Sequence, residues 1–552
     1  MRAIQPGGVM RGSMMDFPLT VNHIFERAGR LFDDREIASR RPDRTIQRYT
    51  YGDFYRRGKR LASALGRAGL RSGDRVATLM WNHSGHLEAY FGAPFAGGVV
   101  HPLNPRLHPD EIAFIAKHAR DRFLLVDDVL LAVFEKIRGK TNFERVIVFR
   151  SGACDQGTEF QDYEAFLASG TEDFCAAPAD ENDAAAMCFT SGTTGQSKGV
   201  VYSHRALVLH SFSLALPDTL GLSNHSAVFP VSPMFHANGW GLPWASVMVG
   251  ARIVFPGPYL DAETLLDTMV EEGVTHSCGV PTVWLSVQAA LEKEPQRWHF
   301  PHPVRILCGG MAPAISLIGE LDRFNLKVVH GWGMTETTPL ATIGSMKSKM
   351  TAWAGDKQLE RRAMQGITTP FVDVRIMRPE GQAPHDGNTP GEIEIRGPWI
   401  AESYFECPDQ QHRWTKDGWF KTGDVATMDE EGYLKIVDRS KDLIKSGGEW
   451  ISSVDLENAL VGHPSVREAA VIGVAHPKWQ ERPLAVVVLK DGAATRPEEL
   501  RAFLGQKFAK WQLPDGFVFV NELPHTSVGK LLKMKLRERY ANWDWNAENS
   551  PR

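Results

Sequence analysis

The sequence predicts an α/β protein with a large N-terminal domain of layered α/β sheets, which includes a small β unit, and a small C-terminal α+β domain. Short apolar runs of the kind that parallel sheets bury recur through the first three quarters of the chain, with helical segments between them. Near residue 380 this pattern gives way to turn-rich segments at 379–382 and 386–391. The change indicates that a second architecture begins there.

The elements of the large domain follow from their periodicity. Phe54, Leu61 and Leu65 fall on one helical face, which predicts a helix over 51–68, and a strand is predicted over 75–81. Further buried strands are predicted at 124–126, 146–149, 184–189, 253–255, 305–308 and 326–329. Helices over 262–272 and 313–324 lie between these strands, as layered α/β architecture requires.

The last third of the chain predicts a β unit followed by a separate small domain. Residues 392–396 alternate like a strand, and the charged stretch 438–442 separates two apolar pieces. A helix over 453–461, strands near 469–474 and 484–489, and a basic helical tail follow it. We therefore divide the chain into a disordered extension (1–16), the large domain (17–438), a hinge (439–444) and the small domain (445–552).

The composition argues against several classes of protein. The 552 residues are 43% hydrophobic and 23% charged, with a net charge of −4, which gives no support to nucleic-acid binding. The six cysteines form no C-x-x-C pair and are typical of reduced thiols in a cytoplasmic protein. The longest apolar stretch, 239–251, is too short to span a bilayer, so no transmembrane segment is expected, and peripheral membrane contact is left open.

The most informative segment is a loop rich in hydrogen-bond donors, which directly follows the apolar run 184–189. Its residues are Thr190, Ser191, Gly192, Thr193, Thr194, Gly195, Gln196, Ser197, Lys198 and Gly199. Glycines let backbone N–H groups approach an anion, and the hydroxyls and the lysine add further donors. The loop therefore predicts a site for the phosphates of a nucleotide.

Two common motifs are similar to this loop but do not fit it. A Walker phosphate loop needs adjacent glycine and lysine followed by Ser or Thr, whereas Lys198 lies between Ser197 and Gly199. Residues 195–199 also spell the G-x-S-x-G of serine hydrolases, but that elbow needs a strand entering the serine and a helix leaving it. Because an extended piece follows Gly199, a serine hydrolase is the weaker alternative.

Five further segments follow the loop in a specific order. They are CGGMAP at 308–313, HGWGMTE at 330–336, WFKTGD at 419–424, DLIKSGGE at 442–449 and PHTSVGK at 524–530. Together with the loop they resemble the adenylate-forming superfamily of acyl-CoA synthetases, luciferases and peptide-synthetase adenylation domains, over nearly the whole chain from about Phe17. Residues 231–240 and 445–480 are most similar to the medium- and long-chain fatty acyl-CoA synthetases within it.

The resemblance implies a two-step reaction that uses ATP, Mg²⁺ and coenzyme A. A carboxylate attacks the α-phosphate of ATP to give an acyl-adenylate and pyrophosphate, and the thiol of coenzyme A then displaces AMP to give a thioester. Attack of one anion on another needs positive charge and positioning more than acid–base chemistry. The resemblance assigns catalysis to Lys530, Glu336, His236 and Thr335. It also implies that Glu336 holds Mg²⁺, with the Thr190 hydroxyl as a second ligand.

Roles toward the nucleotide are implied in the same way. Trp332 would stack on adenine, Gly310 would line the base, and Asp424 would bind the ribose hydroxyls with Arg439 nearby. The complete set implied for ATP and AMP is Thr190, Ser191, Gly192, Thr193, Thr194, Gly195, Lys198, Gly310, Met311, Gly331, Trp332, Gly333, Thr335, Glu336, Asp424, Arg439 and Lys441.

The resemblance further implies that the small domain is mobile and rotates after adenylation, with Lys441 at the hinge position. The face that it would then present to coenzyme A comprises Lys445, Gly447, Gly448, Glu449 and Trp450. The paired glycines carry no side chains that would block a thin pantetheine tunnel. Resemblance to the long-chain enzymes also favours a homodimer.

The identity of the acid is left open. His236 resembles the residue beside the substrate carboxylate, and Trp240 resembles a tryptophan that gates the acyl tunnel. The acyl pocket implied in this way comprises His236, Trp240, Gly279, Gly309, Gly333 and Met334. Because no charged residue in these segments suggests an amino acid or a dicarboxylate, we expect a medium- or long-chain fatty acid. A short substituted acid (a methylthioalkanoate or an aromatic acid), loading of a carrier protein, and luciferase-like oxygenation are the alternatives.

Overall fold

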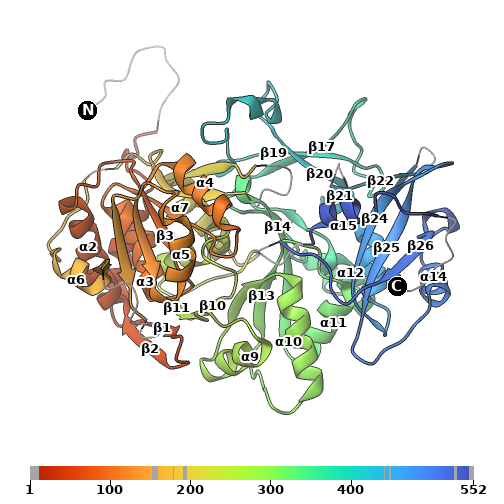
Figure 1. The fold of residues 1–552 in the computed structure, drawn as a ribbon, viewed down its shortest axis with the longest axis horizontal. Coiled ribbons are helices and arrows are strands. Elements are labelled where there is room, and N and C mark those ends of the chain that lie inside the picture. The colour runs from red at the N-terminus through yellow and green to blue at the C-terminus, as the bar shows by residue number, and fades with distance from the viewer. Residues whose placement is uncertain are drawn as a thin grey trace.

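The computed structural model describes residues 12–151, 159–177, 179–190, 196–439, 442–446, 449–526 and 531–545, with residues 449 and 450 described by their backbone. Within these ranges the strands form four sheets. Three sheets belong to a large body, and the fourth lies in a smaller unit at one end, next to the C-terminus (Figure 1). The expected α/β class, with a small C-terminal α+β unit, is confirmed.

A nine-stranded sheet forms the centre of the large body. Its strands, in spatial order, are β16 (Ile367–Thr368), β15 (Leu340–Ile343), β14 (Leu326–Gly333), β13 (Val304–Cys308), β12 (His276–Gly279), β10 (Ala227–Pro230), β11 (Arg252–Phe255), β1 (Glu36–Arg40) and β2 (Ile46–Thr50). The strands from β14 to β1 run parallel, because helices connect them across the faces of the sheet. The helices in this part of the large body include α9 (Ala262–Glu271), α10 (Pro281–Lys293), α11 (Ile315–Arg323) and α12 (Gly355–Ala363).

A seven-stranded sheet lies beside it, toward the N-terminal end of the body (Figure 1). Its strands, in spatial order, are β7 (Gln161–Asp162), β6 (Arg145–Phe149), β5 (Asp121–Asp127), β3 (Arg75–Leu79), β4 (Val99–Pro102), β8 (Ala184–Phe189) and β9 (Gly199–Ser203). The helices of this part are α1 (Val21–Leu31), α2 (Tyr51–Arg67), α4 (Pro109–Ala119), α5 (Leu131–Arg138), α6 (Tyr163–Ala168), α7 (His204–Ala215) and α8 (Leu242–Val249). The loop between β8 and β9 is the predicted phosphate loop.

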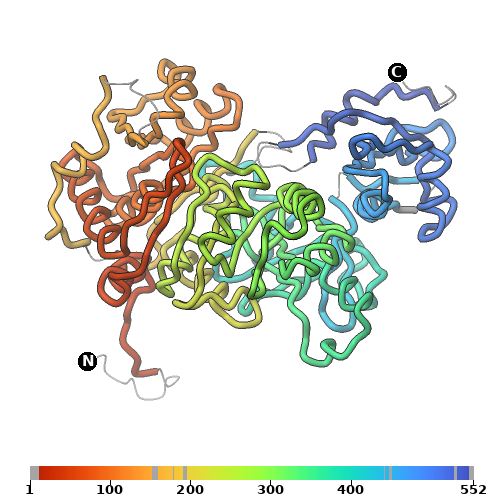
Figure 2. The backbone as a smooth tube through the Cα atoms, turned by 90° about the horizontal axis from the view of Figure 1, so that it is seen from below, coloured from red at the N-terminus to blue at the C-terminus, as the bar shows by residue number. Residues whose placement is uncertain are grey.

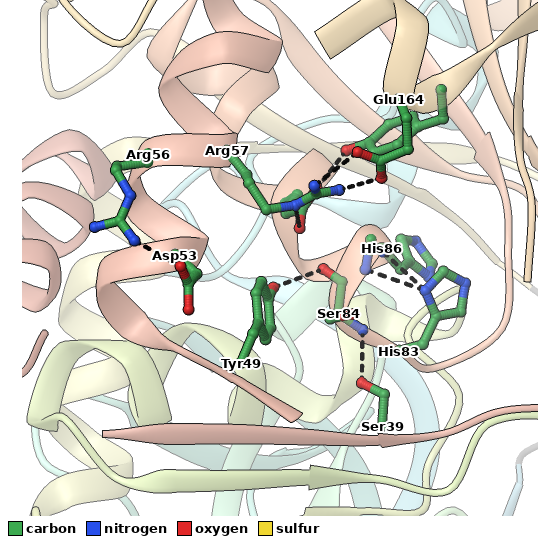
Figure 3. A network of polar contacts seen from close by, with 12 residues as sticks. Ser39, Tyr49, Asp53, Arg56, Arg57, His83, Ser84, His86 and Glu164 are labelled. Carbon is green, nitrogen blue, oxygen red and sulfur yellow. Dashed lines mark hydrogen bonds and ion pairs between the residues drawn. The ribbon is translucent and has the colours of Figure 1, made fainter. Parts of the chain in front are cut away.

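Helix α3 (Ser84–Phe95) lies between the two large sheets, and every one of its residues is buried. A helix that is covered on all sides must satisfy its polar side chains internally. Glu88 is 1% exposed, and it accepts hydrogen bonds from Arg57 (2.7 Å) and from the Tyr163 hydroxyl (2.8 Å). Arg57 also reaches Glu164 (Figure 3). This charge network joins α2, α3 and α6 and stabilises the packing of the body.

The third sheet is the predicted β unit. Its strands, in spatial order, are β18 (Gly381–Gln382), β17 (Asp373–Arg378), β19 (Gly391–Arg396), β20 (Phe420–Met428) and β21 (Leu434–Arg439). All of its pairings are antiparallel, and its inward residues pack in a core that includes Trp332 of β14. The β unit therefore adjoins the carboxyl end of a central parallel strand.

The C-terminal unit has its own sheet and core, and Figure 2 shows it set apart from the rest of the chain. Its strands are β22 (Ile444–Ser446), β23 (Glu449–Ile451), β24 (Val466–His476), β25 (Gln480–Leu489) and β26 (Gly516–Phe519). Its helices are α13 (Ser453–Val461), α14 (Pro497–Leu504) and α15 (Lys533–Arg539). A separate core indicates a separate folding unit.

The predicted helices and strands are confirmed, with small differences at their ends. Strand β8 and helix α13 have the expected limits, whereas the strand expected at 326–329 extends to Gly333. No helix among the described residues is both long and apolar enough to cross a bilayer. The limits of the domains and of the hinge remain predictions, because residues 440 and 441 lie outside the described ranges.

Candidate active site

A cavity of about 260 Å³ lies between the large body and the C-terminal unit. One wall comes from the turn after β13 and from β14, β20 and β21, and the other comes from α13 and from residues 531–534. The cavity brings together seven residues that the sequence assigned to the nucleotide, namely Gly310, Met311, Gly331, Trp332, Gly333, Asp424 and Arg439. Gly310 has a φ of +82°, which glycine adopts without steric cost, so the turn can follow the edge of the cavity.

Three of these residues are in direct contact. The indole Nε1 of Trp332 donates to Asp424 Oδ2 at 3.0 Å, and Arg439 Nε lies 3.2 Å from Asp424 Oδ1. Asp424 and Arg439 are also register partners on β20 and β21, and the Asp424 carboxylate raises the pKa of Arg439. A carboxylate oxygen can accept two hydrogen bonds. Asp424 therefore orients the indole ring and keeps acceptor capacity for hydroxyls in the cavity.

Two hydrogen bonds hold Glu336, and a third holds the neighbouring Thr335. It lies in the short 3-10 helix Thr335–Thr337, directly after β14, and is 4% exposed. Tyr404 donates its hydroxyl to Glu336 Oε1, the Ala401 N–H donates to the Glu336 carbonyl at 2.8 Å, and Tyr202 donates to the Thr335 carbonyl at 2.7 Å. Burial and the nearby carboxylate raise the pKa of Tyr404, so its phenol remains a donor. Glu336 is thus an oriented, buried carboxylate.

The base of the phosphate loop is closed by two hydrogen bonds between Thr190 and Lys198. Thr190 N–H donates to the Lys198 carbonyl at 2.9 Å, and Lys198 N–H donates to Thr190 Oγ1 at 3.1 Å. The Lys198 ammonium lies 5.6 Å from the centre of the Tyr404 ring, a distance typical of a cation–π contact. The other predicted loop residues, Ser191, Gly192, Thr193, Thr194 and Gly195, lie outside the described ranges. Tyr404 therefore contacts both the loop lysine and Glu336.

The two residues predicted to bind the metal carry oxygen atoms that suit a hard cation. Mg²⁺ prefers carboxylate, hydroxyl and phosphate oxygens, and Glu336 and Thr190 supply the first two kinds. Among the described residues no group of three or more His, Cys, Asp or Glu side chains could hold a metal by itself. Glu336 and Thr190 have side chains of the kinds that would hold a Mg²⁺ ion together with phosphate oxygens and water, and their role as ligands remains a prediction.

The serine-hydrolase alternative does not fit the structure. Ser197 donates its hydroxyl to Glu111 at 2.7 Å, and β9, an antiparallel partner of β8, follows at Gly199. A nucleophile elbow requires a helix directly after the serine. That alternative is therefore wrong.

Among the residues predicted for the acyl pocket, His236 and Trp240 lie at a turn, and the three glycines lie in or directly after strands. His236 precedes a turn in which Ala237, Asn238 and Trp240 have φ values of 37°, 44° and 58°. A left-handed conformation costs a non-glycine residue about 1–2 kcal/mol, so this turn is strained. Trp240 is 8% exposed, and its Cη2 atom would lie 3.5 Å from a Cβ built at Gly309. The nearest atom to that Cβ would be the Gly331 carbonyl oxygen at 2.6 Å, so Gly309, which follows β13, is held to glycine by the backbone of β14, with Trp240 beside it.

Two other glycines predicted for the acyl pocket lie close to neighbouring protein atoms. A Cβ at Gly333 would lie 1.7 Å from the carbonyl oxygen of Pro339, and one at Gly279 would lie 3.0 Å from Trp284 Nε1. Gly333 therefore needs to be glycine for packing within the protein, and a Cβ at Gly279 would make a tight contact with the indole. The place of these residues in the acyl pocket remains a prediction. Met334 is partly buried against the core of the β unit.

The residues predicted for catalysis by the small domain and for coenzyme A are only partly described. Lys441, Gly447, Gly448 and Lys530 lie outside the described ranges. Lys445 is exposed on β22, and its N–H donates to Glu481 at 2.9 Å, whereas Glu449 and Trp450 belong to β23 by their backbone. Their roles remain predictions. Tyr404 is a further residue of the site for which no role was predicted from the sequence, because its contact with Glu336 joins residues 68 positions apart.

Comparison with known proteins places this site in a family. Residues 25–405 match the AMP-binding enzyme family, and residues 455–530 match the AMP-binding enzyme C-terminal domain. The chain is 47% identical over 534 residues to a long-chain-fatty-acid–CoA ligase of Thermus thermophilus, with 96% of this chain and 97% of that protein covered. It is 43% identical to a 3-methylmercaptopropionyl-CoA ligase of Ruegeria pomeroyi (96% and 99% covered) and 40% identical to a medium-chain-fatty-acid–CoA ligase of Ectopseudomonas oleovorans (97% and 98% covered).

Solved structures agree with this assignment. The fold matches the anthranilate CoA ligase AuaEII in complex with anthranoyl-AMP with a TM-score of 0.84 at 24% identity, over 95% of this chain and 98% of that one. It matches ATP-bound MatB from Rhodopseudomonas palustris with a TM-score of 0.80 at 26% identity, over 95% and 99% of the two chains. On these matches to both parts of the chain, the protein belongs to the AMP-binding enzyme family.

Proposed function

We propose that this enzyme is an AMP-forming fatty acid–CoA ligase, which makes an acyl-adenylate from ATP and a medium- or long-chain fatty acid and then transfers the acyl group to coenzyme A. The observation that carries the proposal is the joining of Trp332, Asp424 and Arg439 in one cavity wall, in a chain that is 47% identical to a long-chain-fatty-acid–CoA ligase. An aromatic ring, an oriented carboxylate and a guanidinium match the base, the ribose and the phosphates of a nucleotide.

The roles in adenylation follow from charge and position. Lys198 would hold phosphate oxygens at the base of the loop, and Lys530 would bridge the carboxylate and the α-phosphate as charge develops between them. Glu336 and Thr190 would hold Mg²⁺, which when bound neutralises charge on the phosphates. Tyr404 keeps the Glu336 carboxylate in one orientation. His236 would lie beside the acid, and the second step would use the face around Lys445.

One other acid is supported by a specific observation. Two 3-methylmercaptopropionyl-CoA ligases are 42% and 43% identical to this chain over 96% of its length, so a short thioether acid is the second candidate. We further propose that the enzyme acts in the cytoplasm as a homodimer. These two proposals rest on the cysteine composition and on the resemblance to long-chain enzymes.

The test is release of AMP from ATP, measured with and without coenzyme A, across linear fatty acids from short to long chain, with 3-methylthiopropionate and benzoate alongside. Release that depends on coenzyme A and peaks with a linear medium- or long-chain acid supports the proposal. A peak with 3-methylthiopropionate favours the second candidate. Release that is indifferent to coenzyme A contradicts the ligase step and indicates another acceptor, and no release with any acid contradicts the substrate assignment.

A further inference from the structure

A buried cluster of four polar side chains joins the β unit to the C-terminal unit. Asp438 on β21 accepts hydrogen bonds from the Ser453 N–H, at 3.1 Å, and from the Ser453 hydroxyl. Ser453 Oγ in turn accepts from Lys533 Nζ at 2.6 Å, and Lys533 Nζ lies 2.7 Å from Glu457 Oε1. We refer to Asp438, Ser453, Glu457 and Lys533 as the Asp438 cluster.

The Asp438 cluster spans the predicted hinge. Asp438 precedes residues 439–444, whereas its three partners follow them on α13 and α15. A second hydrogen bond also joins the residues before the predicted hinge to those after it, because the Ser452 hydroxyl donates to the Val437 carbonyl at 2.6 Å. Helix α15 packs against β24 and helix α13 against β21, and Figure 1 shows α15 at the side of the C-terminal unit that faces the large body. The cluster therefore connects the β unit to the C-terminal unit, and it also contains contacts within the C-terminal unit.

Charge makes Lys533 the critical member. Asp438 is 2% exposed, and the side chains of Lys533 and Glu457 are 10% and 11% exposed. Burial raises the pKa of Asp438, and it raises the pKa of Glu457 to about 7. Burial by itself lowers the pKa of Lys533, but the two carboxylates outweigh it and the pKa is raised. Lys533 therefore stays charged, and removing it leaves two buried carboxylates without the cation that they share.

The cluster also adjoins the nucleotide cavity. Asp438, Glu457 and Lys533 line it, and so does Leu531. The Leu531 N–H lies 3.4 Å from Met311 Sδ, which belongs to the cavity wall of the large body. Residues 531–534 are thus held at the cavity from both sides. Lys530, the lysine expected to act in adenylation, directly precedes this segment in the sequence.

We propose that Lys533 is a positioning residue for adenylation, which through the Asp438 cluster holds the segment beginning at Leu531 against the nucleotide cavity. The cluster stabilises the arrangement in which the two units meet around the nucleotide. Thioester formation from a ready-made acyl-adenylate, which uses the face around Lys445, does not need it. This inference rests on the proposed function, because that function supplies the two steps.

The experiment compares both half-reactions in the full-length enzyme. Lys533→Met is expected to slow acyl-adenylate formation from ATP and a fatty acid by about tenfold or more, which corresponds to a rise of about 1.4 kcal/mol in the activation free energy. The conversion of a pre-made acyl-adenylate to thioester should stay within about twofold of the parent rate. Lys533→Arg keeps the charge and should retain most of the adenylation rate. Lys535→Met is the matched control, since Lys535 is exposed on the same helix, and both rates should be unchanged.

Hydrogen–deuterium exchange, measured without any substrate, tests the cluster independently of catalysis. Lys533→Met and the isosteric Asp438→Asn should both accelerate exchange in residues 453–461 and 531–539. The first removes the ammonium that donates to Ser453 Oγ, and the second removes the charge and one of the two acceptor oxygens that Ser453 and the Arg439 N–H use. Unchanged exchange in both variants, or an equal loss of both half-reactions, would overturn the inference. If the parent enzyme forms no AMP with any acid, the proposed function fails, while the exchange comparison still decides whether the cluster joins the units.

Discussion

Removal of one hydroxyl group, in Tyr404→Phe, should weaken the use of Mg²⁺-ATP while leaving the fold intact. The hydroxyl donates to Glu336 Oε1, and both side chains are buried, at 7% and 4% exposure. The phenylalanine ring would keep the contact with the Lys198 ammonium and the edge-to-face contact with Trp414, whose ring centre lies 5.3 Å away. The substitution therefore isolates the hydrogen bond that orients Glu336.

The size of the effect follows from the kind of hydrogen bond. A buried hydrogen bond to a charged acceptor contributes about 1.5–3 kcal/mol. Because 1.4 kcal/mol corresponds to a factor of ten, kcat/KM for Mg²⁺-ATP should fall by about 10- to 150-fold. The Glu336 carboxylate would still be present, so the loss should be smaller than that of Glu336→Ala.

The assay is acyl-adenylate formation at saturating fatty acid, with Mg²⁺-ATP varied, and a thermal shift with Mg²⁺-ATP as a second reading. Tyr540→Phe is the matched control, because the Tyr540 hydroxyl is buried and has no hydrogen-bond partner among the described residues. That variant should be neutral or slightly stabilised. If Tyr404→Phe and Tyr540→Phe have the same kinetics and the same Mg²⁺-ATP stabilisation, the orientation of Glu336 by Tyr404 has no functional role.

The remaining predictions concern catalysis, the metal, the acyl chain and pH. Lys530→Ala should abolish acyl-adenylate formation while a pre-made adenylate is still converted to thioester, and equal loss of both steps would contradict separate roles for the two faces. Glu336→Ala should raise the Mg²⁺ concentration needed for half-maximal AMP release, and an unchanged requirement would exclude it as a ligand. Trp240→Ala should shift the preferred chain length more than the KM for ATP, and an unaltered chain-length profile would remove it as a gate. Burial raises the pKa of Glu457 from 4.5 to about 7, so the folded protein keeps a proton that the unfolded chain loses, and the free energy of unfolding should fall as pH rises between these values. Glu457→Gln should flatten that slope, as measured by denaturant titration at several pH values.

Most of the fold could be predicted because its elements are defined locally. The run 184–189 is apolar and short, and it forms β8 with those limits, whereas the periodic segment 51–68 forms α2. The same holds for α13, whose N-terminal Ser452 accepts a hydrogen bond from the Asp455 N–H. Strand order could not be read in this way, because periodicity reports which face of an element is buried but not which element covers it.

Some residues of the candidate site could likewise be predicted from the sequence, whereas the contacts between them could not. The resemblance of six ordered motifs to the adenylate-forming superfamily identified Trp332, Glu336 and Asp424, and in the structure Trp332 lies at the end of β14, Glu336 shortly after it and Asp424 within β20. The contacts that fix those residues come from distant parts of the sequence. Tyr404 lies 68 positions from Glu336, and Asp424 lies 92 positions from Trp332.

The sequence by itself determined the α/β class, the order of the elements and the residue types that a nucleotide needs, because apolar periodicity and donor-rich loops are local properties. Only the tertiary structure decided that Gly333 is required by Pro339, that Tyr404 orients Glu336, and that Ser453, which accepts a hydrogen bond from Lys533, joins the two units at Asp438. The physical reason is that burial and ionic pairing depend on which side chains meet, and a linear pattern carries that information only after the sheets have been assembled.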